Sequence, residues 1–309
     1  MIEVERLRKL YGSVEALRDV SFAVEPGTVY ALLGPNGAGK TTTVKILTTL
    51  SRPDGGSARV AGIDVMRAPR RVRQRIGVVA QQAGTDTEAT GRENLMLQGR
   101  LCGVGGAALR ERVGELLDAF GLADAADRAA RTYSGGMRRR LEIAMGILHR
   151  PTILFLDEPT AGLDPEARRL VWREVERLRG EGLTILLTTH YLDEAERLAT
   201  TVGIVDRGSL VAEGHPEALK AEIGSDVITV ELMDGDAQHA LRALTGYDAE
   251  IAGEGRVRAR VPDAGRAVPA VVATLAEADC APLSVTVTRP SLDDVFVKHA
   301  GRAFDGGAG

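Results

Sequence analysis

The hydrophobic residues in the first 220 positions form short runs that are separated by helical patterns. Residues 29–33, 153–156 and 184–187 are strand-length segments that are almost entirely apolar. Such runs are typical of strands buried on both faces of a sheet. The intervening stretches repeat their apolar residues at helical spacing. This alternation predicts an α/β fold with a parallel sheet wrapped by helices.

Two other patterns flank these predicted strands. Residues 2–24 alternate apolar and polar positions up to a Pro-Gly turn, which predicts antiparallel strands. From about 85 to 150 the apolar spacing is helical, and Thr90 with Glu93 forms a capping box near its start. We therefore expect an antiparallel β subdomain and a helical insert between two strands of the central sheet.

The hydrophobic period changes after about residue 222. Residues 228–232, 257–261 and 283–287 alternate like strands, and helical stretches lie near 237–244 and 268–278. This order predicts a small α+β domain of βαββαβ type with one solvent-exposed sheet face. The expected domains are a large α/β domain at 1–221, with its helical part at about 85–150, and a small accessory or regulatory domain at 222–302. A disordered tail is expected at 303–309.

Composition narrows the class of protein. The chain has 309 residues, 44% of them hydrophobic, and a net charge of −4. That length suits one large domain plus a small one, and the charge provides no general basic field for nucleic acid. Cys102 and Cys280 lack metal-ligand partners in the sequence and are expected to be buried free thiols of a cytosolic protein. The charged N-terminus does not resemble a signal peptide, and no run reaches the roughly 18 apolar residues of a membrane helix.

The loop after the first buried run carries the first chemical motif. It fits the phosphate-loop pattern GxxxxGK[ST] with Gly34, Pro35, Asn36, Gly37, Ala38, Gly39, Lys40 and Thr41. Such a loop surrounds phosphate oxygens with backbone N–H groups at a helix N-terminus. Lys40 is predicted to neutralise the β- and γ-phosphates of ATP, Thr41 to bind Mg²⁺, and Thr42 to contact the nucleotide. A glycine turn with an incidental lysine is the less favoured alternative.

Two carboxylates follow the apolar run at 153–156. Asp157 and Glu158 lie at the carboxyl end of a predicted parallel strand, where such sheets bind their ligands. Asp157 is predicted to hold Mg²⁺ through water, and Glu158 to polarise the attacking water. Alone, the pair could equally be solvated carboxylates at a strand end. The phosphate loop favours the catalytic interpretation.

A third motif indicates the family. Residues 133–137 read Tyr-Ser-Gly-Gly-Met, which resembles the LSGGQ signature of ATP-binding cassette (ABC) ATPases. The resemblance implies a P-loop NTPase of ABC type whose site is shared by two copies. Ser134 and the amides of Gly135 and Gly136 would grip the γ-phosphate on the other copy's phosphate loop. Ser134 could also be a simple helix N-cap, and the two roles are compatible.

The resemblance assigns roles to four further residues, which follow in family order. It implies that Tyr11 stacks on adenine, Gln81 senses Mg²⁺ and links to the membrane partner, Asp164 lies in a loop crossing the dimer interface, and His190 contacts the γ-phosphate. Structural alternatives are core packing for Tyr11 and helix capping for Asp164. Gln82 is the alternative to Gln81, which is preferred for its spacing after residues 76–77.

Three basic clusters remain outside these motifs. The arginines within 67–75 are interpreted as a solvated face, and the triplet at 138–140 as partly salt-bridged surface. Arg256, Arg258 and Arg260 form a row on the predicted C-terminal sheet. Contact of this row with anionic lipid headgroups is the alternative to a solvated face.

The amino-acid sequences of three segments indicate a subfamily. Residues 90–95, 133–137 and 290–296 resemble the daunorubicin-resistance type of bacterial exporter ATPases. This implies an ATP- and Mg²⁺-dependent homodimer on the cytoplasmic face of the cell membrane, bound to a separate polytopic permease. It implies export of a drug or another hydrophobic or lipid-like compound, and no nucleic acid partner.

Two other functions are kept as alternatives. One is an ABC importer ATPase, which would work with an extracytoplasmic binding protein. The other is a soluble ABC ATPase acting on ribosomes or DNA. Translation-type members usually carry two cassettes, and chromosome-type members insert long coiled coils. This chain has one cassette and no sustained heptad pattern, so the second alternative is disfavoured.

Overall fold

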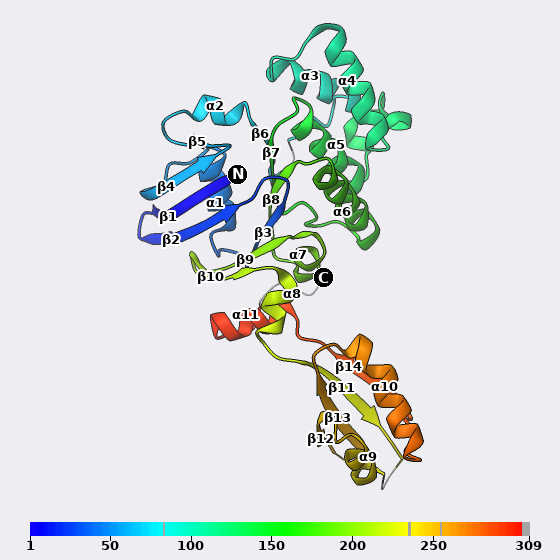
Figure 1. Cartoon of the computed structure of the whole chain (residues 1–309). Helices are drawn as coiled ribbons and strands as arrows, with labels where there is room; N and C mark the ends of the chain where they lie inside the picture. Colours follow the sequence, from blue (N-terminus) through cyan, green and yellow to red (C-terminus); the bar gives the residue numbers. More distant parts are fainter. Residues whose placement is uncertain (83, 234–235, 254, 305–309) are drawn as a thin grey trace. The chain divides into compact units, whose positions relative to one another are not determined.

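The computed structural model describes residues 1–82, 84–233, 236–253 and 255–304 (Figure 1). The chain forms two compact units, a first unit built on Met1–Pro216 and a second unit, Glu217–Arg302. From residue 305 onward, the tail predicted at 303–309 lies outside the described residues. Among the helices that are described, none combines the length and apolar character of a membrane span.

The first unit is built on a six-stranded central sheet (Figure 1). Its strands in spatial order are β10 (Ser209–Gly214), β9 (Thr201–Asp206), β3 (Val29–Leu33), β8 (Thr184–Thr189), β7 (Ile153–Asp157) and β6 (Ile76–Val79). All neighbours are parallel except β10 and β9, which are antiparallel. Every residue of β3, β7 and β8 is buried, which confirms that these apolar runs are strands covered on both faces.

A second, fully antiparallel sheet packs onto the same core. Its order is β2 (Val14–Val24), β1 (Ile2–Tyr11), β4 (Gly55–Val60) and β5 (Ile63–Asp64). Phe22 of this sheet stacks on Tyr30 of the central sheet with ring centroids 4.9 Å apart. The helix α1 (Lys40–Leu47) buries Val44 and Leu47 in the same cluster. This packing fixes the helix that follows the phosphate loop.

Helices cover the remaining parts of the first unit. After α2 (Pro69–Arg73), the segment between β6 and β7 holds α3 (Gly91–Leu101), α4 (Gly106–Ala119), the 3₁₀ turns Ala123–Ala125 and Ala130–Thr132, and α5 (Gly135–Ile147). The capping box of Thr90 and Glu93 is present at the start of α3. The helices α6 (Pro165–Gly180) and α7 (Leu192–Leu198) follow, and α8 (Pro216–Ala221) begins at the boundary with the second unit. Cys102, which was expected to be buried, is exposed at the end of α3. The α/β class, with its mixed sheet, antiparallel sheet and helical insert, is confirmed.

The second unit has the chain order βαββαβ followed by one helix. Its antiparallel sheet has the order β12 (Asp248–Ile251), β13 (Arg256–Val261), β11 (Asp226–Glu231) and β14 (Ser284–Thr288), with helices α9 (Ala237–Ala243), α10 (Ala264–Glu277) and α11 (Leu292–Ala300). The residues Ile228, Val257 and Leu275 lie in its hydrophobic core. Leu283 and Val287 were expected to share a buried face, but Leu283 precedes β14 and is 67% exposed, and Val287 lies on this edge strand and is 38% exposed.

Two members of the arginine row in the second unit, Arg256 and Arg260, are paired with carboxylates. Arg256 lies 2.7 Å from Glu231, and Arg260 lies 3.4 Å from Asp248 and 3.2 Å from Glu250. The row is therefore part of a salt-bridged, solvated face, which favours that interpretation over a site for anionic lipid headgroups.

Candidate active site

The phosphate loop joins β3 to α1 in a conformation that requires glycine. Gly37 and Gly39 have φ angles of 80° and 108°, in the region that side chains rarely adopt. A Cβ atom on Gly39 would lie 2.7 Å from the carbonyl oxygen of Ala16, and one on Gly34 would lie 2.2 Å from that of Val205. The loop therefore passes so close to the surrounding backbone that side chains at these positions would clash with it.

Lys40 lies at the end of this loop and is 4% exposed. Its Nζ donates to the carbonyl oxygens of Gly34 at 2.6 Å and Pro35 at 3.1 Å, and it lies 3.6 Å from Oε1 of Glu158. Burial lowers the pKa of Lys40 from its ordinary value, and the carboxylate of Glu158 opposes that effect. The ammonium group is thus held among oxygen atoms, as a phosphate-binding lysine requires.

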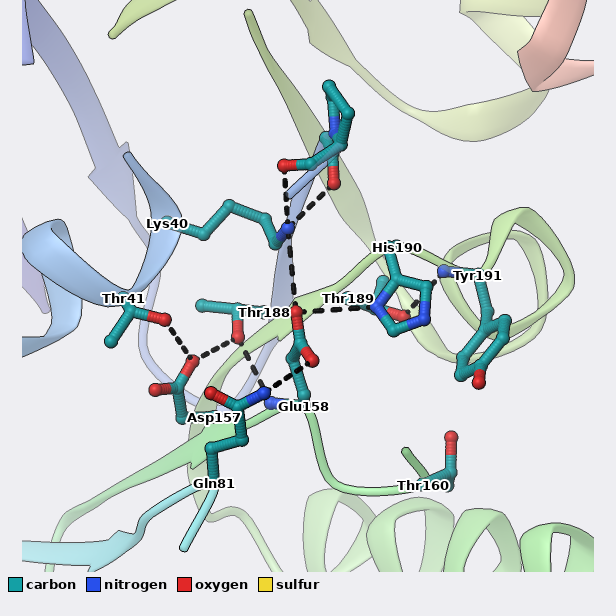
Figure 2. A network of polar contacts seen from close by, with 12 residues as sticks. Lys40, Thr41, Gln81, Asp157, Glu158, Thr160, Thr188, Thr189, His190 and Tyr191 are labelled. Atoms are coloured by element: carbon teal, nitrogen blue, oxygen red, sulfur yellow. Dashed lines mark hydrogen bonds and ion pairs between the residues drawn. The ribbon is translucent and has the colours of Figure 1, made fainter. Parts of the chain in front are cut away.

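Asp157 and Thr41 lie together at the carboxyl end of the sheet. The Oδ1 atom of Asp157 accepts hydrogen bonds from Thr41 Oγ1, at 3.3 Å, and from Thr188 Oγ1 on β8 (Figure 2). Within the described residues no group of three or more His, Cys, Asp or Glu is placed to hold a metal ion. A carboxylate with one hydroxyl suits Mg²⁺, which takes further ligands from nucleotide phosphates and water.

Glu158 occupies the centre of the site and is 8% exposed. Its Oε2 accepts a hydrogen bond from Gln81 Nε2 at 3.1 Å, and its Oε1 lies 3.3 Å from His190 Nδ1 (Figure 2). The backbone N–H of Glu158 donates to the carbonyl and hydroxyl oxygens of Thr188, at 3.1 and 3.0 Å. Its φ of 47° is in the left-handed region. The fold thus brings Lys40, Gln81, Glu158 and His190 to one point.

These side chains surround a cleft of about 610 Å³. The predicted residues that line the cleft are Asn36, Gly37, Ala38, Gly39, Lys40, Thr41, Thr42, Gln81, Glu158 and His190. A larger hollow of about 910 Å³ lies at the opposite ends of the strands, where Ile153 and Thr184 begin β7 and β8. The smaller cleft is therefore the candidate active site.

Tyr11 lies at the end of β1, outside the lining of this cleft. It is 48% exposed, its hydroxyl lies 3.5 Å from Ser51 Oγ, and the ammonium of Lys9 lies 5.2 Å from its ring centre. The alternative that Tyr11 packs in the core is therefore wrong. Its stacking on adenine stays a prediction.

The signature residues begin α5 and also lie outside the lining of the cleft. Ser134 is the N-cap, and its Oγ accepts from the N–H of Met137 at 3.2 Å. Ser134 and Gly135 are exposed, whereas a Cβ atom on Gly136 would lie 2.8 Å from that of Ala167 on α6. The N-terminus of α5 can therefore meet a ligand that is not held by its own chain's phosphate loop.

Asp164 caps the next helix, α6. Its Oδ1 accepts from the N–H groups of Glu166 at 3.0 Å and Ala167 at 2.9 Å. The helix-capping role, which was the structural alternative for Asp164, is therefore confirmed. Its place at a dimer interface stays a prediction.

A buried carboxylate that the sequence analysis did not identify lies behind the site. Glu194 on α7 is fully buried, and its Oε1 accepts from Thr160 Oγ1 at 2.8 Å and Trp172 Nε1 at 2.9 Å. Burial raises the pKa of Glu194 above its ordinary value. It ties α6 and α7 to the loop that follows Glu158.

The interpretation of the basic triplet at 138–140 as surface is wrong for Arg139, which is 8% exposed. It donates hydrogen bonds to the main-chain carbonyls of Ala80, which precedes Gln81, and of Glu158. The available signal was its spacing, because Gly136, Arg139 and Ile143 fall on one face of the helix, and all three are buried.

The fold and this constellation define a P-loop ATPase of the ATP-binding cassette class. A family model described as ABC transporter matches residues 17–161, and one described as ATP-binding protein DrrA1-3-like, C-terminal domain, matches residues 214–300. The chain is 46% identical to the daunorubicin resistance ATP-binding protein DrrA2 of Streptomyces coeruleorubidus, covering 97% of this chain and 95% of that one. It is 40% identical to the Nod factor export ATP-binding protein I of Ralstonia nicotianae, covering 98% and 94%.

Solved structures that resemble this chain are also ATP-binding subunits of the ABC class. An ATP-binding subunit of an ABC transporter is 30% identical, with a TM-score of 0.65 over 72% of this chain and 92% of that one. A dimeric, post-hydrolysis ATP-binding cassette bound to ADP and phosphate is 25% identical, with a TM-score of 0.64 over 70% and 98%. The chain belongs to the ABC transporter family, in which this domain binds and hydrolyses ATP. The predicted resemblance and the ATPase activity are confirmed.

Proposed function

We propose that this chain is the ATPase subunit of an ABC exporter and drives efflux of a drug or another hydrophobic, lipid-like compound. One observation supports a site shared between two copies. Lys40, Glu158 and His190 line one cleft, whereas Ser134 begins a helix outside its lining. The resistance and export names of near-full-length relatives favour export over import or a soluble role on ribosomes or DNA.

Binding of ATP with Mg²⁺ is the first step of this proposal. Lys40 would exchange the carbonyls of Gly34 and Pro35 for β- and γ-phosphate oxygens. Thr41 would hold Mg²⁺ directly and Asp157 through water, with Gln81 beside them. The bound ion would neutralise negative charge on the phosphates.

Hydrolysis is assigned to Glu158. Gln81 donates a hydrogen bond to its carboxylate and His190 Nδ1 lies 3.3 Å from the other oxygen, which would orient it to accept a proton from the attacking water. Such general-base catalysis contributes about 10²- to 10⁴-fold to a rate. His190 would also contact the γ-phosphate.

A second copy would complete each site. The exposed N-terminus of α5 carries a favourable potential for phosphate, and Ser134, Gly135 and Gly136 provide its donors. In the homodimer each γ-phosphate would lie between one chain's Lys40 and the other chain's Ser134. Asp164 would lie near the interface.

We assign the membrane-spanning part to a separate polytopic permease, with this chain peripheral on the cytoplasmic face. A hollow of about 150 Å³ is lined in part by Val78, Gln82 and Met145, and Leu97 and Leu101 on α3 are 52% and 74% exposed. This apolar surface suits a protein partner. Affinity purification in mild detergent is expected to recover a stoichiometric membrane protein, whereas ribosomal proteins or nucleic acid would contradict export.

We propose that residues 222–302 form an accessory or regulatory domain of βαββαβ type. The helix α8 (Pro216–Ala221) lies between that boundary and the last strand of the ATPase domain. Deleting the chain from residue 222 is expected to leave ATP binding intact. Loss of nucleotide binding would show that the boundary is misplaced.

The variant Glu158→Gln tests the shared site. It keeps the shape of the side chain but removes the proton acceptor, so hydrolysis should fall by about 10²- to 10⁴-fold. ATP should then trap the dimer, which size-exclusion chromatography with saturating ATP would detect. Glu111→Gln, at an exposed carboxylate on α4, is the control and should behave like the wild type. A Glu158→Gln protein that stays monomeric would refute the shared site.

A further inference from the structure

Arg139 donates to five acceptors from inside the first unit. Its Nε donates to the carbonyl of Pro159 at 2.7 Å, one terminal nitrogen to the carbonyl of Ala80 at 2.9 Å and to Glu142 Oε2 at 2.8 Å, and the other to the carbonyls of Asp157 at 3.0 Å and Glu158 at 3.2 Å. A guanidinium has five N–H donors, so every one has a partner. Arg139 and Glu142 are 8% and 9% exposed, so these bonds are shielded from water.

The backbone acceptors of Arg139 belong to two segments of the proposed catalytic site. Ala80 precedes Gln81, which holds the carboxylate of Glu158. Asp157 and Pro159 flank Glu158. Arg139 itself lies on α5, about one turn from the exposed Ser134 and Gly135. One side chain therefore connects the helix that would grip the partner's nucleotide with the residues that would hydrolyse this chain's own nucleotide.

The backbone of Glu158 needs such support. A non-glycine residue with a φ of 47° is uncommon, and at functional sites such conformations persist where the surroundings hold them. Arg139 bonds the carbonyl of Glu158 and those of both neighbours. Removing the guanidinium would leave these carbonyls without that donor and would free the direction of the Glu158 side chain.

We propose that Arg139 is a positioning residue that couples the two nucleotide sites of the dimer. The N-terminus of α5 binds the partner's γ-phosphate. As long as α5 keeps its present position, Arg139 holds Glu158 of its own chain in position for hydrolysis. A shift of α5 would break these bonds and displace Glu158. This inference rests on the shared site proposed above.

The substitutions Arg139→Gln and Arg139→Lys test the positioning role. Misplacing a reacting group by about 1 Å can cost about 10²-fold in rate, so Arg139→Gln should lower kcat by that order. ATP affinity should stay within about threefold, because the loss falls on kcat and not on ground-state binding. Lysine offers three donors without the planar fork, so Arg139→Lys should restore kcat only in part. Arg138→Gln, at the neighbouring arginine on the same helix, is the matched control and should leave kcat unchanged.

Mixed dimers test which site Arg139 serves. Differently tagged copies are purified through both tags, with Arg139→Gln and Glu158→Gln placed either in the same chain or in opposite chains. If Arg139 positions its own chain's Glu158, the same-chain dimer should keep about half of the wild-type ATPase rate, since one site is intact. The opposite-chain dimer should keep a few per cent, because one site lacks its base and the other its positioning residue.

The reverse ranking, or equal rates in the two arrangements, would overturn the proposal. If Arg139 served only the binding of α5 to the partner's nucleotide, the same-chain dimer would be inactive, because one site would lack its base and the other its contact with α5. Both arrangements contain the same two substitutions, so a general loss of stability cannot produce a difference between them. If Glu158→Gln forms no ATP-dependent dimer, the shared site itself fails and this inference fails with it. If the dimers form but the same-chain and opposite-chain arrangements have equal ATPase rates, only the coupling role of Arg139 is rejected.

Discussion

Gly91 and Tyr133 meet where α3 packs against the residue that precedes Ser134. A Cβ atom on Gly91 would lie 2.3 Å from the hydroxyl oxygen of Tyr133 and 3.2 Å from its Cζ. That hydroxyl donates to the carbonyl of Ala125 at 2.7 Å, and Tyr133 is 4% exposed, so the ring cannot simply move aside. We therefore expect Gly91→Ala to destabilise the first unit.

The magnitude follows from two opposing effects. Overpacking of this kind costs about 1–3 kcal/mol, whereas alanine is better than glycine in a helix by up to about 1 kcal/mol. With the full helix gain, the net loss in the free energy of unfolding should be about 0–2 kcal/mol. Gly114→Ala on α4 is the control, because its Cβ would have no atom within 4 Å. It should gain about 0.5–1 kcal/mol.

The measurement is urea unfolding followed by fluorescence of Trp172, the single tryptophan of the chain, which is buried on α6 in the same unit. Tyr133→Phe removes the clashing oxygen and with it the overpacking cost, so Gly91→Ala should cost about 1–3 kcal/mol less in that background. Tyr133→Phe alone should cost about 1 kcal/mol for the lost hydrogen bond. A Gly91→Ala protein as stable as Gly114→Ala, or an equal cost in both backgrounds, would refute the reasoning.

Two further predictions concern Glu194 and Thr41. Burial raises the pKa of Glu194 above its ordinary value of 4.5, so the folded state favours the neutral form and the free energy of unfolding falls as pH rises through the raised pKa. Glu194→Gln should therefore be more stable than the wild type at pH 8 but not at pH 4 in urea unfolding, and an equal effect at both would contradict this. Thr41→Ala should raise the Mg²⁺ concentration for half-maximal ATPase by at least about tenfold, since it removes a proposed ligand. An unchanged requirement in a Mg²⁺ titration would exclude Thr41 as a ligand.

The sequence predicted well those features that depend on local pattern. The apolar runs became the buried strands β3, β7 and β8, because only a strand covered on both faces tolerates such a run. The motif residues Lys40 and Glu158 then met, because parallel strands bring their carboxyl ends to one edge of the sheet.

The features that were missed depend on contacts between distant segments. Arg139 was assigned to the surface because charged side chains are seldom buried, and its acceptors are backbone carbonyls of segments far apart in the chain. Glu194 is satisfied by donors on two other elements, Thr160 and Trp172. No local period reveals such partners. Leu283 and Val287 alternate like core residues, but pairing order decides which strand is the edge.

The charged face of the second unit has a consequence for how the protein is held at a membrane. Arg256 and Arg260 on this face are paired with Glu231, Asp248 and Glu250, which weakens the positive field of the arginine row, and salt screens exposed charges further. A self-compensated surface attracts anionic lipid weakly. If the proposed permease holds the protein, a high-salt wash should leave the protein on the membrane, and detergent should release it together with that subunit.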